Sequence, residues 1–329
     1  MNSDTFRTVI KSEPYDFKLS YHSKLMFAGS CFTEHIGKRL KELKFKVNIN
    51  PFGIIYNPIS LAESLDFIIE NKQFCEKDLV FNNEFWHSFF HHGKFSRTNK
   101  KKTLDVINIS LSESSEFLIA ADFLFVTLGT AWVYYHHKTE QIVANCHKLP
   151  ASEFKKYLLT ENEIVKAFRE VIEKIRTINK KLKIIFSVSP VRHLNNGFTE
   201  NFLSKAMLRT SINKICKSNF ETYYFPAYEI LIDDLRDYRF YNSDLIHPNH
   251  TASGYIFDFF KNTFFSEEAE TISGKIQKII SARKHRLFNP ETKQSKDFVN
   301  NSLKRIRKLK EMYPFLNFDE DEKYFLSVK

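Results

Sequence analysis

Apolar runs typical of buried strands alternate along the chain with amphipathic stretches typical of helices. The runs KLMFA, FLFVTL, KIIFSV and TYYF are short, rich in β-branched or aromatic residues, and bounded by polar or turn-forming positions. They predict strands at residues 24–28, 123–128, 183–188 and 222–225, with helices at 32–45, after the capping sequence TENE at 160–163, at 204–217 and at 251–264. This alternation predicts a parallel sheet with helices on both faces.

The longest apolar stretch, residues 117–135, has two interpretations. It is long enough to be a membrane span, but Asp122, Thr127, Gly129 and Thr130 interrupt it. Its Phe, Val and Thr content favours the end of a helix followed by a buried strand.

Composition is that of a globular protein able to bury a core. Of the 329 residues, 43% are hydrophobic and 27% are charged, which excludes collagen-like, coiled-coil and disordered classes. The four cysteines form no C-x-x-C pair, so neither a disulfide framework nor a structural zinc site is expected. The first residues do not form a basic start followed by an apolar stretch, and we expect a reduced, soluble, cytoplasmic protein.

The sequence changes character near its end. Residues 281–310 hold ten Lys and Arg but only two acidic residues, in a chain of net charge +10. We predict a main domain at 1–265 and a basic helical C-terminal extension at 266–329. The extension is either a solvated helical tail or a surface for an anionic partner; without a recognised motif, no nucleic acid is expected.

Two segments carry candidate chemistry. In Asp244-Leu245-Ile246-His247, a carboxylate three residues before an imidazole can fix its tautomer and stabilise the imidazolium, although the same spacing also occurs in simple loop capping. In Gly29-Ser30-Cys31, a strand gives way to a helix whose N-terminus stabilises a thiolate or an oxyanion. The alternative is that Cys31 is a small buried packing residue.

Together these segments resemble the SGNH/GDSL hydrolase superfamily, in which a Gly-Asp-Ser-Leu motif follows the first strand and an Asp-x-x-His motif lies near the end of the domain. The string Gly29-Ser30-Cys31-Phe32 resembles the signature of the GSCFA family within it. The resemblance implies a three-layer α/β/α flavodoxin-like sandwich and ester hydrolysis by a nucleophile-His-Asp triad. Further segments of the same family pattern are Asn50-Pro51-Phe52-Gly53, Trp86-His87-Ser88, Asn145-Cys146-His147-Lys148 and Ser189-Pro190-Val191-Arg192-His193.

The resemblance also assigns roles. Asp244 and His247 match the Asp-x-x-His pair. An ungapped match of the first motif makes Cys31 the nucleophile, whereas a shift by one residue makes it Ser30; a thiol is the easier group to activate. The backbone N–H of Gly53 would complete the oxyanion hole with that of Cys31.

The sequence departs from the superfamily at its third block. Where the pattern has Gly-x-Asn, this chain has Gly129-Thr130-Ala131, and alanine has no side-chain donor. Thr130, Asn145 or His147 is a candidate substitute for this oxyanion donor. Loss of such a donor typically costs about 10²–10³ in rate, so without a substitute the enzyme is slow, runs another acyl transfer or has lost activity.

Other residues are candidates for the substrate site. Arg192 and His193 follow a strand and suit an anionic substrate group, with a structural salt bridge as the alternative. Trp132 suits a pocket wall or equally the core, and His147 is a further substrate-binding candidate. His87, His91 and His92 lack the ligand set of a zinc site, so we expect no metal, and no cofactor is needed.

Three functions remain open. The first is hydrolysis of a small-molecule, glycan or lipid O-acyl ester. The second is acyl transfer from a thioester, such as one of coenzyme A, to a glycan or lipid alcohol. The third is non-catalytic binding of an anionic partner through the basic extension. The oligomeric state cannot be predicted.

Overall fold

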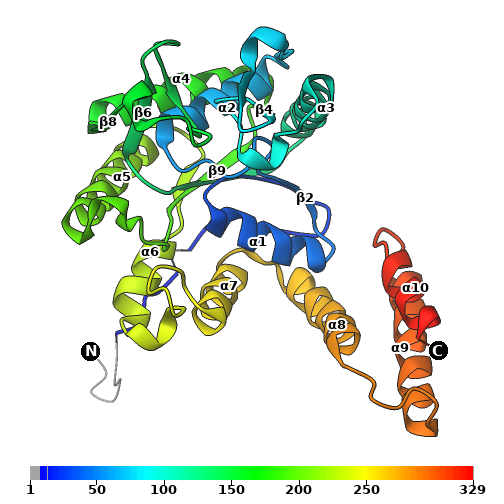
Figure 1. The fold of residues 1–329 in the computed structure, drawn as a ribbon. Coiled ribbons are helices and arrows are strands. Elements are labelled where there is room, and N and C mark those ends of the chain that lie inside the picture. Colours follow the sequence, from blue (N-terminus) through cyan, green and yellow to red (C-terminus); the bar gives the residue numbers. More distant parts are fainter. Residues whose placement is uncertain (1–7, 13, 329) are drawn as a thin grey trace.

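A five-stranded parallel sheet forms the centre of the computed structural model, which describes residues 8–12 and 14–328 (Figure 1). The strand order is β10-β9-β5-β1-β2. In chain order this is 2-1-3-4-5, the flavodoxin-like arrangement, so the predicted fold class is confirmed. The strands are β1 (Lys24–Gly29), β2 (Lys46–Ile49), β5 (Phe123–Leu128), β9 (Lys183–Val188) and β10 (Thr222–Tyr224).

Each face of the sheet contributes to its own apolar core. Phe27, Phe125 and Ile185 stand in register across β1, β5 and β9 and belong to one core. Met26 and Leu124 alternate with them and belong to the other. This two-sided burial explains why the strands read as continuous apolar runs.

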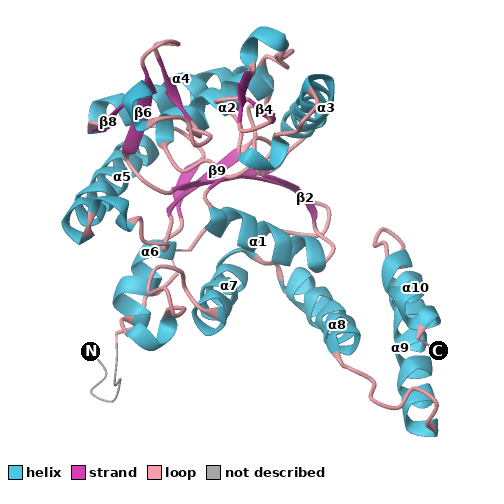
Figure 2. Ribbon diagram, in the orientation of Figure 1, coloured by secondary structure: helices cyan, strands magenta, loops and turns pink. Residues whose placement is uncertain are grey.

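Helices cover both faces (Figures 1 and 2). The second core joins the sheet to helices on the upper face in the view; the first joins it to the helices below and to those of the C-terminal region. The upper helices are α2 (Pro58–Ile69), α3 (Lys100–Ile119), α4 (Glu161–Ile178) and α5 (Phe198–Ser218). The others are α1 (Cys31–Glu42), α6 (Ala227–Glu229), α7 (His250–Phe264), α8 (Glu267–Lys284), α9 (Lys293–Met312) and α10 (Asp319–Ser327).

Two small antiparallel sheets lie beside the upper helices and were not predicted from the sequence. The stretch 117–135 holds the end of α3, β5 and then a strand of one of these sheets, as expected for a helix end followed by a buried strand. None of the helices in the described part of the chain is long and apolar enough to cross a bilayer. The additional strands are β3 (Val80–Asn82), β4 (Phe85–His87), β6 (Trp132–His136), β7 (Gln141–Val143) and β8 (Phe154–Leu158).

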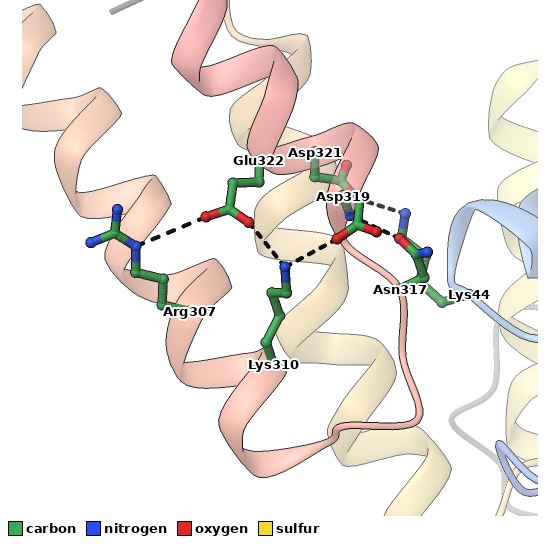
Figure 3. A network of polar contacts seen from close by, with 7 residues as sticks. All are labelled: Lys44, Arg307, Lys310, Asn317, Asp319, Asp321 and Glu322. Atoms are coloured by element: carbon green, nitrogen blue, oxygen red, sulfur yellow. Dashed lines mark hydrogen bonds and ion pairs between the residues drawn. The ribbon is translucent and has the colours of Figure 1, made fainter.

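Ion pairs connect the C-terminal helices to each other and to the rest of the chain (Figure 3). Lys310 of α9 donates to Asp319 and to Glu322 of α10, at 3.0 Å each. Asp321 of α10 is buried and pairs with Lys44, which follows α1, at 2.6 Å. The same carboxylate accepts a hydrogen bond of 2.7 Å from Arg283 of α8. The predicted boundary at residue 265 remains a prediction, and residues 1–7 of the first segment lie outside the described residues.

Replacing Asp321 with alanine should lower the free energy of unfolding by about 2–3 kcal/mol, because two cations lose their buried partner. Urea denaturation measures the effect. Glu320, an exposed neighbour on the same helix, is the control, and Glu320→Ala should change stability by less than about 0.5 kcal/mol. Equal stabilities of the two variants would contradict this account of how the C-terminal helices are held.

Candidate active site

The turn after β1 places Cys31 where ligands bind in folds of this topology. Sheets with this order bind ligands outside the carboxyl ends of the strands, where the order reverses between β1 and β5. Gly29 adopts φ +135°, and a Cβ there would lie 2.2 Å from the carbonyl oxygen of Thr127 on β5. Only glycine suits this close approach. Its N–H donates to the Asn50 side chain at 2.9 Å, which fixes the turn from the side of β2.

Ser30 and Cys31 differ sharply in access. Ser30 is 0% exposed, and its hydroxyl oxygen has no hydrogen-bond partner among the described residues. Its N–H donates to the Thr127 carbonyl at 3.1 Å. Cys31 is the first residue of α1 and is half-buried. The geometry therefore favours the thiol over the hydroxyl as the group that a substrate can reach.

The Cys31 thiol experiences opposing influences. Burial is the largest influence and leaves the pKa of the thiol above its ordinary value. Hydrogen bonds from the backbone N–H groups of Phe32 and Cys31 and the charge of Lys205 lower this pKa in part, and Glu34 raises it. The helix N-terminus thus supplies the donors that stabilise a thiolate. Tyr56 lies near enough for Cys31 to raise the pKa of its phenol, after the larger effect of burial.

Asp244 and His247 form the hydrogen-bonded pair that their spacing predicts. The Nδ1 of His247 lies 2.7 Å from Oδ2 of Asp244, and the other oxygen accepts the N–H groups of Ile246 and His247 at 2.8 and 3.0 Å. These three contacts, the two backbone ones foremost, lower the pKa of the carboxyl to about 2, so Asp244 is ionised at neutral pH. Both side chains are exposed, and in the described part of the chain no hydrogen bond joins His247 to Cys31.

Arg192 attaches the loop of this pair to the end of β9. Its backbone N–H and its guanidinium donate to the carbonyls of Ile246 and Leu245, at 3.3 Å each. The guanidinium also lies 4.3 Å from the ring centroid of Tyr241. Arg192 thus holds the loop that carries Asp244 and His247. Its contacts are with backbone carbonyls and an aromatic ring, so none of them is the structural salt bridge that the sequence analysis gave as an alternative to anion binding.

His193 follows Arg192 in the loop after β9 and lies near Tyr56. Its ring centroid is 6.0 Å from that of Tyr56, and its N–H donates to the Asn201 side chain at 2.8 Å. Burial and then the charge of Lys205 lower its pKa. His193 thus belongs to the surroundings that Tyr56 and Lys205 share with Cys31.

The predicted oxyanion donors are used in other contacts. The N–H of Gly53 donates to the Asn50 carbonyl at 2.7 Å. The hydroxyl of Thr130 is buried, lies 3.1 Å from that of Ser204, and accepts the N–H of Trp132. The structure therefore offers neither group to the Cys31 site in this conformation.

Asn145 and His147 pack within the upper region of the molecule. The Asn145 side chain accepts the N–H of His147 at 2.8 Å, and Nε2 of His147 lies 2.8 Å from the Ser88 carbonyl. The His147 ring stacks on His87 at 4.4 Å, and burial lowers its pKa to about 4. In the described part of the chain, no hydrogen bond joins Asn145 or His147 to Cys31. Trp132 is half-buried, and Lys156 lies 5.6 Å from the centroid of its ring.

The sequence analysis missed Lys205. This side chain is 2% exposed, on the buried face of α5, and its charge acts on both Cys31 and His193. A signal existed, because Lys205 stands at core spacing with Leu208, Ile212 and Ile215 in a predicted helix.

The described residues contain no group of three or more His, Cys, Asp or Glu side chains that could hold a metal ion.

Comparison with known proteins identifies two matching family models. The model described as "GSCFA family" matches residues 24–260, and that described as "GSCFA domain protein, C-terminal domain" matches residues 276–327. No curated protein matches. Among solved structures, the chain is similar to a carbohydrate esterase family 3 protein from Talaromyces cellulolyticus, with 9% identity, TM-score 0.35, and coverage of 78% of this chain and 99% of that one.

Proposed function

The chain belongs to the GSCFA family, and from this premise we propose that it cleaves or transfers O-acyl esters with Cys31 as nucleophile. The observation that carries the proposal is the position of Cys31: a half-buried thiol on the first residue of α1, at the β1–β5 switch point. The neighbouring hydroxyl of Ser30 is fully buried.

The Asp244–His247 pair supplies the proton chemistry in this proposal. Asp244, ionised and bonded to Nδ1, leaves Nε2 as the nitrogen that takes the thiol proton. The two motifs lie at the same edge of the sheet, since Arg192 ties the His247 loop to the end of β9. The mechanism requires His247 to reach Cys31 in the substrate complex, where catalytic hydrogen bonds often tighten.

The reaction proceeds in two steps that share one acyl-enzyme. The Cys31 proton passes to His247 as the sulfur bonds to the ester carbonyl carbon. The C–O bond to the alcohol then breaks, and the alcohol leaves with the proton from His247. Water, or a second alcohol in the transferase variant, gives a proton to His247 and attacks the thioester. Release of the acid or new ester returns the proton to the sulfur.

Incubation with a p-nitrophenyl acetate series tests the proposal. We expect a burst of nitrophenolate that matches the enzyme concentration, followed by steady turnover, because a thioester intermediate accumulates. Adding acetyl thioester and glycan or glycerol acceptors separates the two reactions: transferred acyl groups indicate a transferase, and free acetate a hydrolase. Nitrophenolate release no faster than with heat-denatured protein would refute the proposal.

A further inference from the structure

Lys205 is a fully buried cation at the carboxyl edge of the central sheet. Its Nζ donates to the carbonyls of Gly129 at 2.7 Å and Ser189 at 2.8 Å, which follow the ends of β5 and β9. Lysine is almost never fully buried unless it is paired. Two neutral carbonyls satisfy hydrogen bonds but do not balance a charge.

The charge environment of Lys205 contains no carboxylate partner within the described part of the chain. Burial lowers its pKa to about 7, and the charged group that opposes this shift is Cys31. His193 faces Lys205 from the loop after β9, and Tyr228, just after the start of α6, has its ring centroid 5.7 Å from Nζ. A thiolate at Cys31 is therefore the anion that this buried ammonium lacks.

The topology explains why these two residues share one corner of the fold. β1, β5 and β9 are adjacent strands, and Cys31 follows the first of them by two residues. Lys205 spans the ends of the other two. Glu34 and Tyr56 are the remaining titratable groups that act with Lys205 around Cys31.

Within the described residues, the donors of the loop after β5 are already used in other contacts. The N–H of Ala131 donates to the Ser204 hydroxyl at 2.8 Å, and the Thr130 hydroxyl contacts the same group. Ser204 thus closes the loop, and the next residue of α5 is Lys205. Two consecutive residues of α5, Ser204 and Lys205, therefore hold the loop after β5, in which Ala131 has no side-chain donor.

We propose that Lys205, in its protonated form, is the positive charge of the Cys31 site and stabilises the thiolate and the oxyanion formed on attack. The inference rests on the proposed function of Cys31. It assigns to Lys205, acting through Cys31, the stabilisation of the oxyanion that the loop after β5 does not provide.

Alkylation of Cys31 by iodoacetamide across a pH series tests this role without any ester turnover. The protein used has Cys75, Cys146 and Cys216 replaced by alanine. Lys205→Met should raise the pH midpoint of alkylation by about one unit and slow the reaction about tenfold near neutral pH, because only the thiolate reacts. Lys214→Met is the matched control, since Lys214 is an exposed lysine of the same helix that pairs with Glu161, and its profile should equal that of the parent. An unchanged profile in folded Lys205→Met would overturn the inference.

A second measurement keeps Lys205 intact if its replacement prevents folding. In ¹³C-lysine-labelled protein, the lysine that titrates nearest to neutral pH should titrate at least one unit higher in Cys31→Asp than in Cys31→Ala, because the aspartate imitates the thiolate. Equal titration, or the absence of any such lysine, would overturn the inference. If alkylation shifts as expected but no ester is cleaved, Lys205 keeps its role and the proposed function fails instead.

Discussion

Replacing Cys31 with alanine is expected to lower kcat for p-nitrophenyl acetate by about 10³-fold or more, because no covalent intermediate can form. The remaining rate would come from binding and oxyanion stabilisation alone. Initial rates and burst amplitudes measure the loss, and the burst itself should disappear. Circular dichroism verifies that the variant folds.

Two controls separate the nucleophile from other thiols and from its neighbour. Cys75 is exposed and lies before β3, so Cys75→Ala should retain full activity. Ser30→Ala removes a buried hydroxyl without a partner among the described residues, and should leave kcat within a few-fold of the parent. Loss of activity in Ser30→Ala with retention in Cys31→Ala would transfer the nucleophilic role to the hydroxyl.

Replacing His247 with alanine should cost about as much as replacing Cys31, and the double variant should lose no more than either single one. Groups that act as one unit in proton transfer and attack give such non-additive losses. Asp244→Asn, which keeps the size of the side chain but removes its charge, should cost about 10²–10⁴-fold, since the imidazolium is no longer stabilised and the tautomer is no longer fixed. Steady-state kinetics of the three single variants and the double variant measure these effects.

His250 is the matched control for His247. It lies three residues further on, at the start of α7, and is also exposed. His250→Ala should leave kcat unchanged within about twofold, because substitution of an exposed residue away from the proposed site usually changes stability very little. If His247→Ala were as active as the parent, the Asp244–His247 pair would be a loop cap and another base would have to activate Cys31.

Much of the sheet could be predicted because its strands are buried on both faces. The predicted strands at residues 123–128 and 183–188 coincide with β5 and β9, and the TENE sequence forms the predicted capping box before α4. The small antiparallel sheets were missed since their strands are three to five residues long and half-exposed, with weak alternation.

The site could be predicted only where its chemistry is local in sequence. The Asp244–His247 bond spans three residues, so spacing alone was sufficient to propose it. The positions of Gly53, Asn145 and His147 depend on hydrogen bonds to other segments, which spacing does not specify. Lys205 is 76 residues from Gly129, with which it forms a hydrogen bond, so its sequence position does not indicate this contact. Lysine is also rarely buried, so a lysine in a predicted helix is expected at the surface.

Mass mapping of the acyl-enzyme tests the central claim most directly. The protein is mixed with a slight excess of p-nitrophenyl acetate, quenched in acid within the burst phase, digested and analysed by tandem mass spectrometry. The account predicts one acetyl group on the sulfur of Cys31, removable by hydroxylamine and missing in Cys31→Ala. An acetyl group on Ser30 or elsewhere, or a burst without any acylated peptide, would contradict it.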